Sequence, residues 1–208
     1  MKIAIGQIGT DADKTANFAL VAQAVITAAM NHARLILFPE ATMRAFGTGR
    51  LDEIAEPLDG PFVSALAGLA KNYNIAIVVG MFRPADQHVV SGRTINRVYN
   101  TTVAICPDGT VVHYDKIHTY DAFGYRESDT IKPGKNLVTF TYNAVTFGLA
   151  TCYDLRFPQQ FRQLARCGAD IILVPTSWAD GPSKLQQRQL LIRARALDAT
   201  SWVIAADQ

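Results

Sequence analysis

The sequence lacks the features that mark several classes of protein. Its longest apolar stretches fall well short of the roughly 20 residues that span a bilayer, and the N-terminus turns polar by Gln7, too soon for a secretory signal peptide. It has no run of Lys and Arg, and a net charge of +2 is too small to indicate a nucleic-acid-binding surface. We therefore expect a cytoplasmic protein that binds neither membranes nor nucleic acids.

Cysteines are few, and motifs for metals or cofactors are missing. The three cysteines, Cys106, Cys152 and Cys167, are odd in number and widely spaced, so without an export signal we expect reduced thiols. No cluster of His, Cys and Asp has the spacing of metal ligands, and there is no Gly-rich phosphate-binding loop. The sequence predicts neither a metal nor an organic cofactor.

What the chain does have is enough apolar sequence for one domain over residues 1–208, with 49% hydrophobic and 18% charged residues. Apolar runs alternate with helical patterns and with two hairpin signals, which predicts an α/β layered domain with more than one sheet and helices on the outer faces. The expected strands cover residues 2–8, 35–38, 75–81, 98–106, 111–116, 137–142, 145–151, 171–174 and 202–205. The expected helices run from Thr10 or Asp11 to about Ala29, and over 61–72, 158–167 and 183–199.

Cys152 lies where an apolar strand gives way to a helix that begins near Pro158. Hydrolases of several folds place a nucleophile at such a sharp strand-to-helix turn, and the N-terminus of the following helix favours the thiolate. We therefore predict that Cys152 is the nucleophile. The other two cysteines, Cys106 and Cys167, are expected to be inert, as most free cysteines are.

Three further charged residues lie at or just beyond strand ends: Glu40, Lys116 and Glu127. Ends of neighbouring strands converge on one side of a sheet, so these residues are candidates to meet Cys152 in a cleft. A carboxylate can take the thiol proton and later activate water, while a lysine and the backbone N–H of Tyr153 can hold an oxyanion. For the second carboxylate, other acids in the same loop compete with Glu127, namely Asp121 and Asp129.

For several nearby residues, two roles remain open. His118 could serve a Cys–His hydrolase, although that chemistry would leave Glu40 and Lys116 unused. Asp154 and Arg156 could form a structural pair, or Arg156 could bind a substrate carboxylate. Trp178 could line the pocket or close the core.

Three segments carry a family resemblance: FPE at 38–40, YDKIH at 114–118 and CYDLRFP at 152–158. They resemble the signature segments of the nitrilase superfamily, the carbon–nitrogen hydrolases. Further stretches match in order, at 127–128 with 133–134, at 168–178, at 193–198 and at 205–208. The resemblance covers nearly the whole chain, although the family pattern continues past Gln208, so the domain is expected to be short at its C-terminus.

The resemblance implies a four-layer αββα sandwich, a homodimer or higher homo-oligomer, and a Glu–Lys–Cys triad of Glu40, Lys116 and Cys152, with Glu127 as a supporting glutamate. The sequence of residues 152–158 is most similar to that of the Nit-type branch, which includes ω-amidases and deaminated-glutathione amidases. The expected enzyme is therefore an amidase that cleaves a small linear amide through a thioester and releases ammonia or an amine. A nitrilase, an N-carbamoyl hydrolase and a truncated inactive scaffold are the alternatives.

Overall fold

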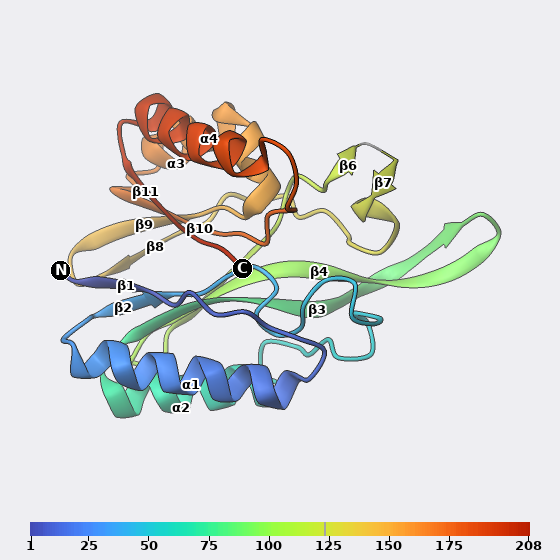
Figure 1. Cartoon of the computed structure of the whole chain (residues 1–208). Helices are drawn as coiled ribbons and strands as arrows, with labels where there is room; N and C mark the ends of the chain where they lie inside the picture. The colour runs from blue at the N-terminus through green and yellow to red at the C-terminus, as the bar shows by residue number, and fades with distance from the viewer. Residues whose placement is uncertain (123) are drawn as a thin grey trace.

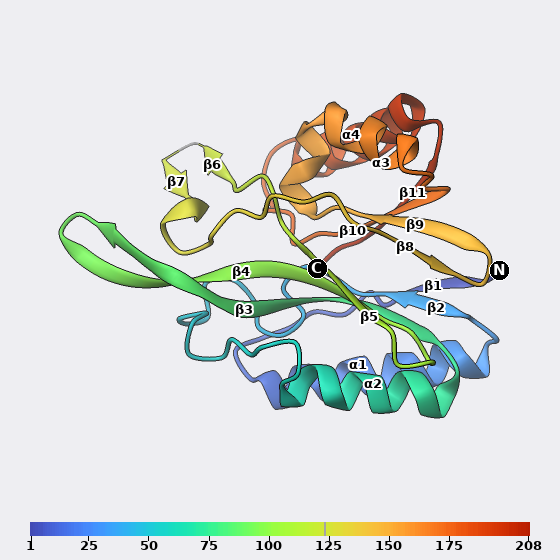
Figure 2. The ribbon, with the colours of Figure 1, turned by 180° about the vertical axis from the view of Figure 1, so that it is seen from behind.

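The computed structural model describes residues 1–122 and 124–208 and arranges them in four layers. Two β-sheets stack face to face, and a pair of helices covers the outer face of each sheet (Figures 1 and 2). This is the αββα sandwich that the family resemblance implied, so the expected fold class is confirmed. None of the helices in the described residues is long and apolar enough to cross a membrane.

The first sheet has the strand order β1-β2-β3-β4-β5. Its first three strands are parallel, and β4 and β5 continue the sheet in antiparallel fashion, so β5 runs in the same direction as β2. The strands are β1 (Ile3–Ile5), β2 (Leu35–Leu37), β3 (Ala76–Val90), β4 (Arg93–Ile105) and β5 (Val111–Asp115), and the covering helices are α1 (Lys14–Met30) and α2 (Pro61–Tyr73).

The second sheet has the order β11-β10-β9-β8, with only β8 antiparallel to its neighbour. Its strands are β8 (Thr139–Tyr142), β9 (Val145–Leu149), β10 (Ile171–Pro175) and β11 (Trp202–Ala206), covered by α3 (Pro158–Arg166) and α4 (Lys184–Ala199). The remaining elements are short: β6 (Asp121–Ala122), β7 (Tyr125–Arg126) and the 3-10 helices η1 (Glu127–Asp129) and η2 (Cys152–Arg156).

Three apolar clusters fill the spaces between the four layers. Strand β2 shows how the sequence divides between them: Ile36 packs toward α1 and α2, whereas Leu35 and Leu37 pack between the two sheets. Side chains alternate along a strand, so a strand that is buried on both faces reads as a continuous apolar run. A third cluster around Phe161 and Ile172 joins the second sheet to α3 and α4.

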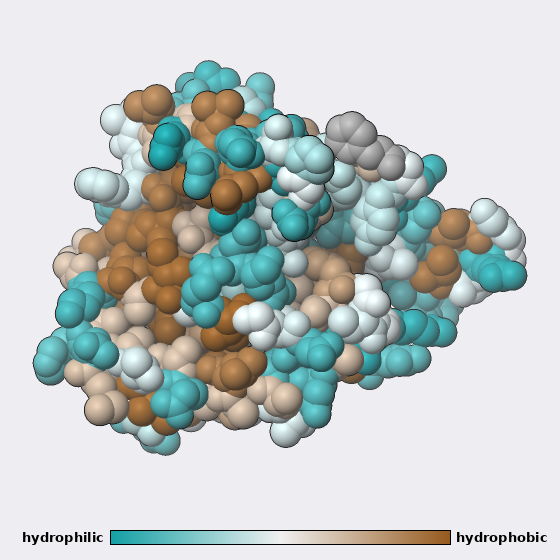
Figure 3. Space-filling model, viewed as in Figure 1, coloured by the Kyte–Doolittle hydropathy of each residue, from teal (hydrophilic) through white to brown (hydrophobic). Residues whose placement is uncertain are grey.

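One edge of each sheet, formed by β1 and by β11, lies on the same side of the molecule (Figure 1). In the described residues, β1 and β11 each pair with a single neighbouring strand. Apolar surface is exposed over these edge strands (Figure 3), and it includes Ile5, which is 51% exposed, and Trp202, which is 77% exposed. These two edge strands thus leave large apolar side chains exposed on this face.

The expected strands at 75–81 and 98–106 are parts of a much longer hairpin, β3–β4, which extends from the body of the protein into solvent (Figure 1). Its outer half is exposed and polar, and it includes Pro84, where the strand register shifts, so it shows no apolar alternation. The turn uses Ser91 and Gly92, both with positive φ, as two-residue hairpin turns do.

Two expected helix starts also differ. Helix α1 begins at Lys14, because the carboxylate of Asp13 accepts hydrogen bonds from the N–H groups of Thr15 and Ala16; neither Thr10 nor Asp11 opens it. After Cys152 the chain first forms η2, and α3 follows at Pro158. The direction of the strands brings the carboxyl ends of β2, β5, β9 and β10 to one end of the sandwich, where the loops that follow them meet.

Candidate active site

Cys152 is the first residue of η2 and has a φ of +46°, in the left-handed region that side chains with a Cβ rarely adopt. Such a conformation costs about 1–3 kcal/mol and persists only where the surroundings hold it. Here the turn is held by a reciprocal cap between Thr151 and Asp154. The Sγ atom lies 3.9 Å from the carbonyl oxygen of Ser177, in the loop after β10.

Lys116, directly after β5, is buried between two carboxylates. Its Nζ donates to Glu40 Oε1 at 3.0 Å and to both oxygens of Glu127, at 3.0 and 2.9 Å. All three side chains are at most 5% exposed. The backbone N–H of Tyr120 also donates to Glu127, at 2.5 Å, so this carboxylate is fixed from two sides.

Glu40 is held by further contacts besides Lys116. Its Oε2 accepts from the N–H of Ser177 at 3.0 Å, and its Oε1 accepts from Asn100 Nδ2 at 2.8 Å. The strand β3 passes so close that a Cβ on Gly80 would overlap the Glu40 backbone carbonyl. A glycine at this position is therefore a condition for the observed place of the Glu40 carboxylate.

Asn100, on β4, is a member of the site that was not predicted from the sequence. Asn100 is 1% exposed and donates to Glu40 at 2.8 Å and to Glu127 at 3.4 Å, so it links the two carboxylates that flank Lys116. The signal that could have found it is the polar triplet 100–102 inside a buried strand. Buried polar side chains need partners, so a polar run within an apolar strand indicates a network.

Burial dominates the electrostatics of these groups. Burial raises the pKa of Glu40, and Glu127 adds to the rise, while Lys116 opposes it. Burial also raises the pKa of the Cys152 thiol well above its usual value, with help from the nearby Glu40. For Lys116 burial works toward a lower pKa, but Glu127 and Glu40 outweigh it and raise the pKa well above normal. The resting site therefore favours a thiol beside a carboxylate and a lysinium ion, rather than the thiolate expected from the helix N-terminus alone.

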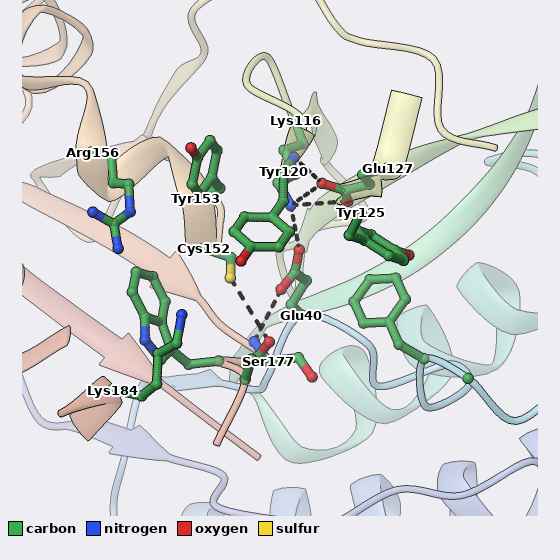
Figure 4. A pocket seen from close by; sticks show the side chains of 14 residues that line it. Glu40, Lys116, Tyr120, Tyr125, Glu127, Cys152, Tyr153, Arg156, Ser177 and Lys184 are labelled. Carbon is green, nitrogen blue, oxygen red and sulfur yellow. Dashed lines mark hydrogen bonds and ion pairs between the residues drawn. The ribbon is translucent and has the colours of Figure 1, made fainter. Parts of the chain in front are cut away.

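These groups open into a cleft of about 390 Å³ (Figure 4). Aromatic side chains form much of its wall, and two cationic side chains, Arg156 and Lys184, lie on one side of Cys152. The Arg156 guanidinium lies 5.8 Å from the ring centres of both Tyr153 and Trp178. The lining residues are Glu40, Phe46, Gly47, Lys116, Tyr120, Tyr125, Glu127, Cys152, Tyr153, Arg156, Ser177, Trp178, Ala179 and Lys184.

The sequence profile of the carbon-nitrogen hydrolase family matches residues 2–208. The chain belongs to this family. The prediction of a carbon–nitrogen hydrolase is thereby confirmed.

Among relatives, the chain is 44% identical over its whole length to a protein described as a hydrolase from Mycobacterium tuberculosis, of which it covers 72%. It is 31% identical to a deaminated glutathione amidase from Escherichia coli O157:H7, covering all of this chain and 78% of that one. Its structure matches a solved amidase from Nesterenkonia with a TM-score of 0.80 and 26% identity, over all of this chain and 78% of the other.

In this hydrolase, the four residues expected to act together, Glu40, Lys116, Glu127 and Cys152, all line one cleft. The competing acids lie elsewhere: Asp121 accepts from the N–H of Ser128, and Asp129 forms an ion pair with the exposed Arg126. Of the three acids in this loop, only the carboxylate of Glu127 reaches Lys116 in the described structure.

The other two cysteines do not line the cleft. Cys106 is buried between the sheets, and burial raises its pKa to about 11, while Cys167 is exposed beyond the end of α3.

The remaining candidates are divided between the cleft and its support. Arg156 and Trp178 line the cleft, whereas the expected pair of Asp154 with Arg156 does not form. Arg156 instead donates to Gln187 at 3.0 Å, and Asp154 pairs with His118. Because His118 faces Asp154 and is not among the lining residues, the geometry disfavours a Cys–His hydrolase. In the described residues no group of His, Cys, Asp and Glu could hold a metal ion.

Proposed function

We propose that this hydrolase is an amidase that cleaves a small linear amide through a thioester on Cys152, with Glu40 and Lys116 completing a triad. One observation carries the proposal: a buried lysinium, held by Glu40 and Glu127, faces the same cleft as a strained cysteine. Carboxylate, lysine and thiol at one reacting carbon supply the base, the oxyanion partner and the nucleophile of acyl transfer.

In the first half-reaction, Glu40 takes the proton of the Cys152 thiol as the sulfur attacks the amide carbon. Because the pKa values of both groups are raised by burial, the proton moves during attack rather than in the resting enzyme. The oxyanion that forms binds the Lys116 ammonium and the backbone N–H of Tyr153, which lies in the first turn of η2, where N–H groups have no partner within the helix.

The tetrahedral intermediate then collapses. Glu40 returns the proton to the nitrogen, and the carbon–nitrogen bond breaks. Ammonia or an amine leaves, and the acyl group stays on Cys152 as a thioester. Glu40 next takes a proton from water as the water oxygen attacks the thioester carbon. The carbon–sulfur bond then breaks, Glu40 returns the proton to the sulfur, and the carboxylic acid leaves the restored thiol. Glu127 does not touch the reacting atoms in this scheme; it fixes Lys116 through two hydrogen bonds.

For the substrate, we propose an amide whose acyl part carries a carboxylate. Besides Lys116, two cations line the cleft, Arg156 and Lys184, and both lie to one side of Cys152 (Figure 4). An arginine beside aromatic rings matches the planar shape of a carboxylate with two donors. The relatives named as a deaminated glutathione amidase and an omega-amidase favour the same class of substrate.

Ammonia release from matched substrates tests the proposal. We expect hydrolysis of a monoamide of a short dicarboxylic acid, slower hydrolysis of the same chain ending in a methyl group, and little activity on the matching nitrile or N-carbamoyl compound. C152A should abolish turnover, and C167S, which removes the exposed thiol, should not. Hydrolysis of the nitrile or the carbamoyl compound in preference to the amide would contradict the assignment, as would a C152A variant with full activity.

A further inference from the structure

Two buried polar side chains beneath the cleft take no part in the proposed chemistry. Asp154, in η2, and Tyr114, on β5, are both 0% exposed. The oxygen of Tyr114 donates to Asp154 Oδ2 at 2.6 Å. A buried carboxylate is costly unless its oxygens are well supplied with donors, so its full set of partners indicates what it does.

Asp154 accepts four hydrogen bonds, which come from two sides. Oδ2 accepts from the hydroxyl of Tyr114 and from the backbone N–H of Thr151 at 2.8 Å. Oδ1 accepts from the backbone N–H of His118 at 3.1 Å and faces the Nδ1 of the same residue at 2.8 Å. One carboxylate thus binds the turn before Cys152 and both ends of the segment 114–118.

The partners of Asp154 are themselves anchored. The Tyr114 hydroxyl accepts from the N–H of Ile117 at 3.1 Å and from Gln160 Nε2 at 2.8 Å, on helix α3. The His118 ring stacks on Phe157, with centres 3.5 Å apart and planes 6° from parallel. The cluster therefore forms one unit with η2 and the start of α3.

This arrangement joins the two reacting groups. Lys116 lies in the middle of 114–118, which begins in the last residues of β5 in the first sheet, whereas Cys152 follows β9 of the second sheet. A further polar link between the sheets lies close by, where the hydroxyls of Thr102, on β4, and Thr151 are 2.8 Å apart. We propose that Asp154 is a positioning residue, which sets the place of the Lys116 ammonium relative to the Cys152 sulfur by tying both segments together.

The proposal rests on the amidase mechanism and adds a role for a residue outside the reacting atoms. A shift of about 1 Å at a catalytic group can cost roughly 100-fold in rate. In D154N an NH₂ group replaces one of the two carboxylate oxygens. The two hydrogen-bond donors that face this oxygen then lose their acceptor. Arg156 is held separately by Gln187 on α4, so we expect kcat to fall while KM changes little.

Three variants and one control test the inference. We expect D154N to lower kcat by about 10- to 100-fold with KM within about threefold. H118A should lower kcat by a smaller factor, and H118N should recover most of it, because the Asn Nδ2 can replace the Nδ1 donor. D86N removes a carboxylate with three donors on the β3–β4 hairpin and should leave kcat unchanged.

A second readout needs no turnover. In a C167S background, iodoacetamide alkylates Cys152 as the sulfur bonds to the methylene carbon and iodide leaves; peptide mass mapping gives the rate at each pH. If the tie keeps Lys116 near the sulfur, D154N and H118A should move the alkylation profile to higher pH, because the thiolate loses its cation. H118N and D86N should match the parent.

The outcomes separate this inference from the proposed function. A parent protein that is alkylated at Cys152 but hydrolyses no amide contradicts the proposed function, and the alkylation profiles still test the tie. A folded D154N with parental kcat and profile overturns the inference, and so does an H118N variant as impaired as H118A. If D154N does not fold, the two His118 variants decide.

Discussion

The protein contains two clusters of three charged side chains, with ion-pair distances of 2.8–3.0 Å in both. One cluster has a cation between two anions, and the other has an anion between two cations. At the active site, one cation, Lys116, lies between Glu40 and Glu127, and every side chain is at most 5% exposed. On the β3–β4 hairpin, one anion, Asp86, lies 2.8 Å from Arg97 and 3.0 Å from Lys132, with the side chains 15–35% exposed.

The pKa shifts of the carboxylates run in opposite directions. Hydrogen bonds from Arg97 lower the pKa of Asp86 to about 2, as expected for a solvated ion pair. At Glu40, burial raises the pKa although the lysine is just as near. The comparison shows that distance alone does not decide what an ion pair does: in water it holds a carboxylate ionised, and in the core it leaves a carboxylate ready to accept a proton.

The largest expected effect comes from removing the shared cation with K116M. We expect kcat to fall by about 100-fold or more, because an oxyanion partner is lost. The free energy of unfolding at pH 7 should fall by about 3–5 kcal/mol, since two buried carboxylates face each other without a cation. Urea unfolding and ammonia release measure the two quantities.

The pH dependence of K116M checks this explanation. Burial already holds the folded-state pKa of Glu40 above its unfolded value, and K116M removes the cation that opposes this rise. The stability that Glu40 contributes is fully present below its unfolded pKa and is lost as the pH rises through the folded one, so the loss should be larger in K116M. K116M should therefore regain part of its stability on acidification, and a deficit that does not change between pH 7 and pH 5 would contradict it.

The second-largest effect is expected from G80A, a substitution that displaces Glu40 without changing the charge of the site. G80A places a methyl group against the backbone of Glu40, and we expect a loss of about 1–3 kcal/mol together with a large fall in kcat. Gly68, inside α2, is the matched control, because a Cβ there meets nothing within 4 Å. G68A should gain up to about 1 kcal/mol through helix propensity. Thermal unfolding measures the change in stability of each variant. Equal changes in G80A and G68A would contradict the close packing of β3 against Glu40.

Local patterns predicted an α/β layered domain and candidate residues for one cleft. Cys152, Lys116 and Glu40 follow apolar runs, and strand ends of one direction converge, so their meeting could be expected from the sequence. The four-layer sandwich and the roles of these residues came from the family resemblance, because a charged residue at a strand end is by itself usually a surface residue.

The missed features depend on contacts between distant segments. Asp154 was expected to pair with Arg156, two residues away, but its partners are Tyr114, on β5 of the other sheet, and His118, in the loop after β5. Asn100 reaches two carboxylates from the middle of β4. The outer half of the β3–β4 hairpin is exposed, so no apolar alternation marks it. Sequence pattern reports which side chains are buried, not which buried polar groups meet.

A smaller effect concerns the charge that Glu127 adds to the buried cluster. Glu40 must be ionised to take the thiol proton, and its raised pKa places the acid limb of kcat/KM above pH 4.5. Because Glu127 contributes to that rise, E127Q should move the acid limb to lower pH, besides lowering kcat. D129N changes a neighbouring acid of η1 whose partner, Arg126, is exposed, and it should leave the limb in place. An unmoved limb in E127Q would show that the two carboxylates titrate independently.

The smallest effect is expected at the exposed cluster. Because the folded-state pKa of Asp86 is lowered to about 2 from 3.8, its contribution is present above pH 3.8 and is lost as the pH falls toward 2. Solvent screens the pair, so D86N should cost less than about 1 kcal/mol at pH 7, and less still in high salt. Urea unfolding at low and high salt measures both. A salt-independent loss as large as that of K116M would mean that the hairpin cluster is as shielded as the active site, and the contrast between the two would fail.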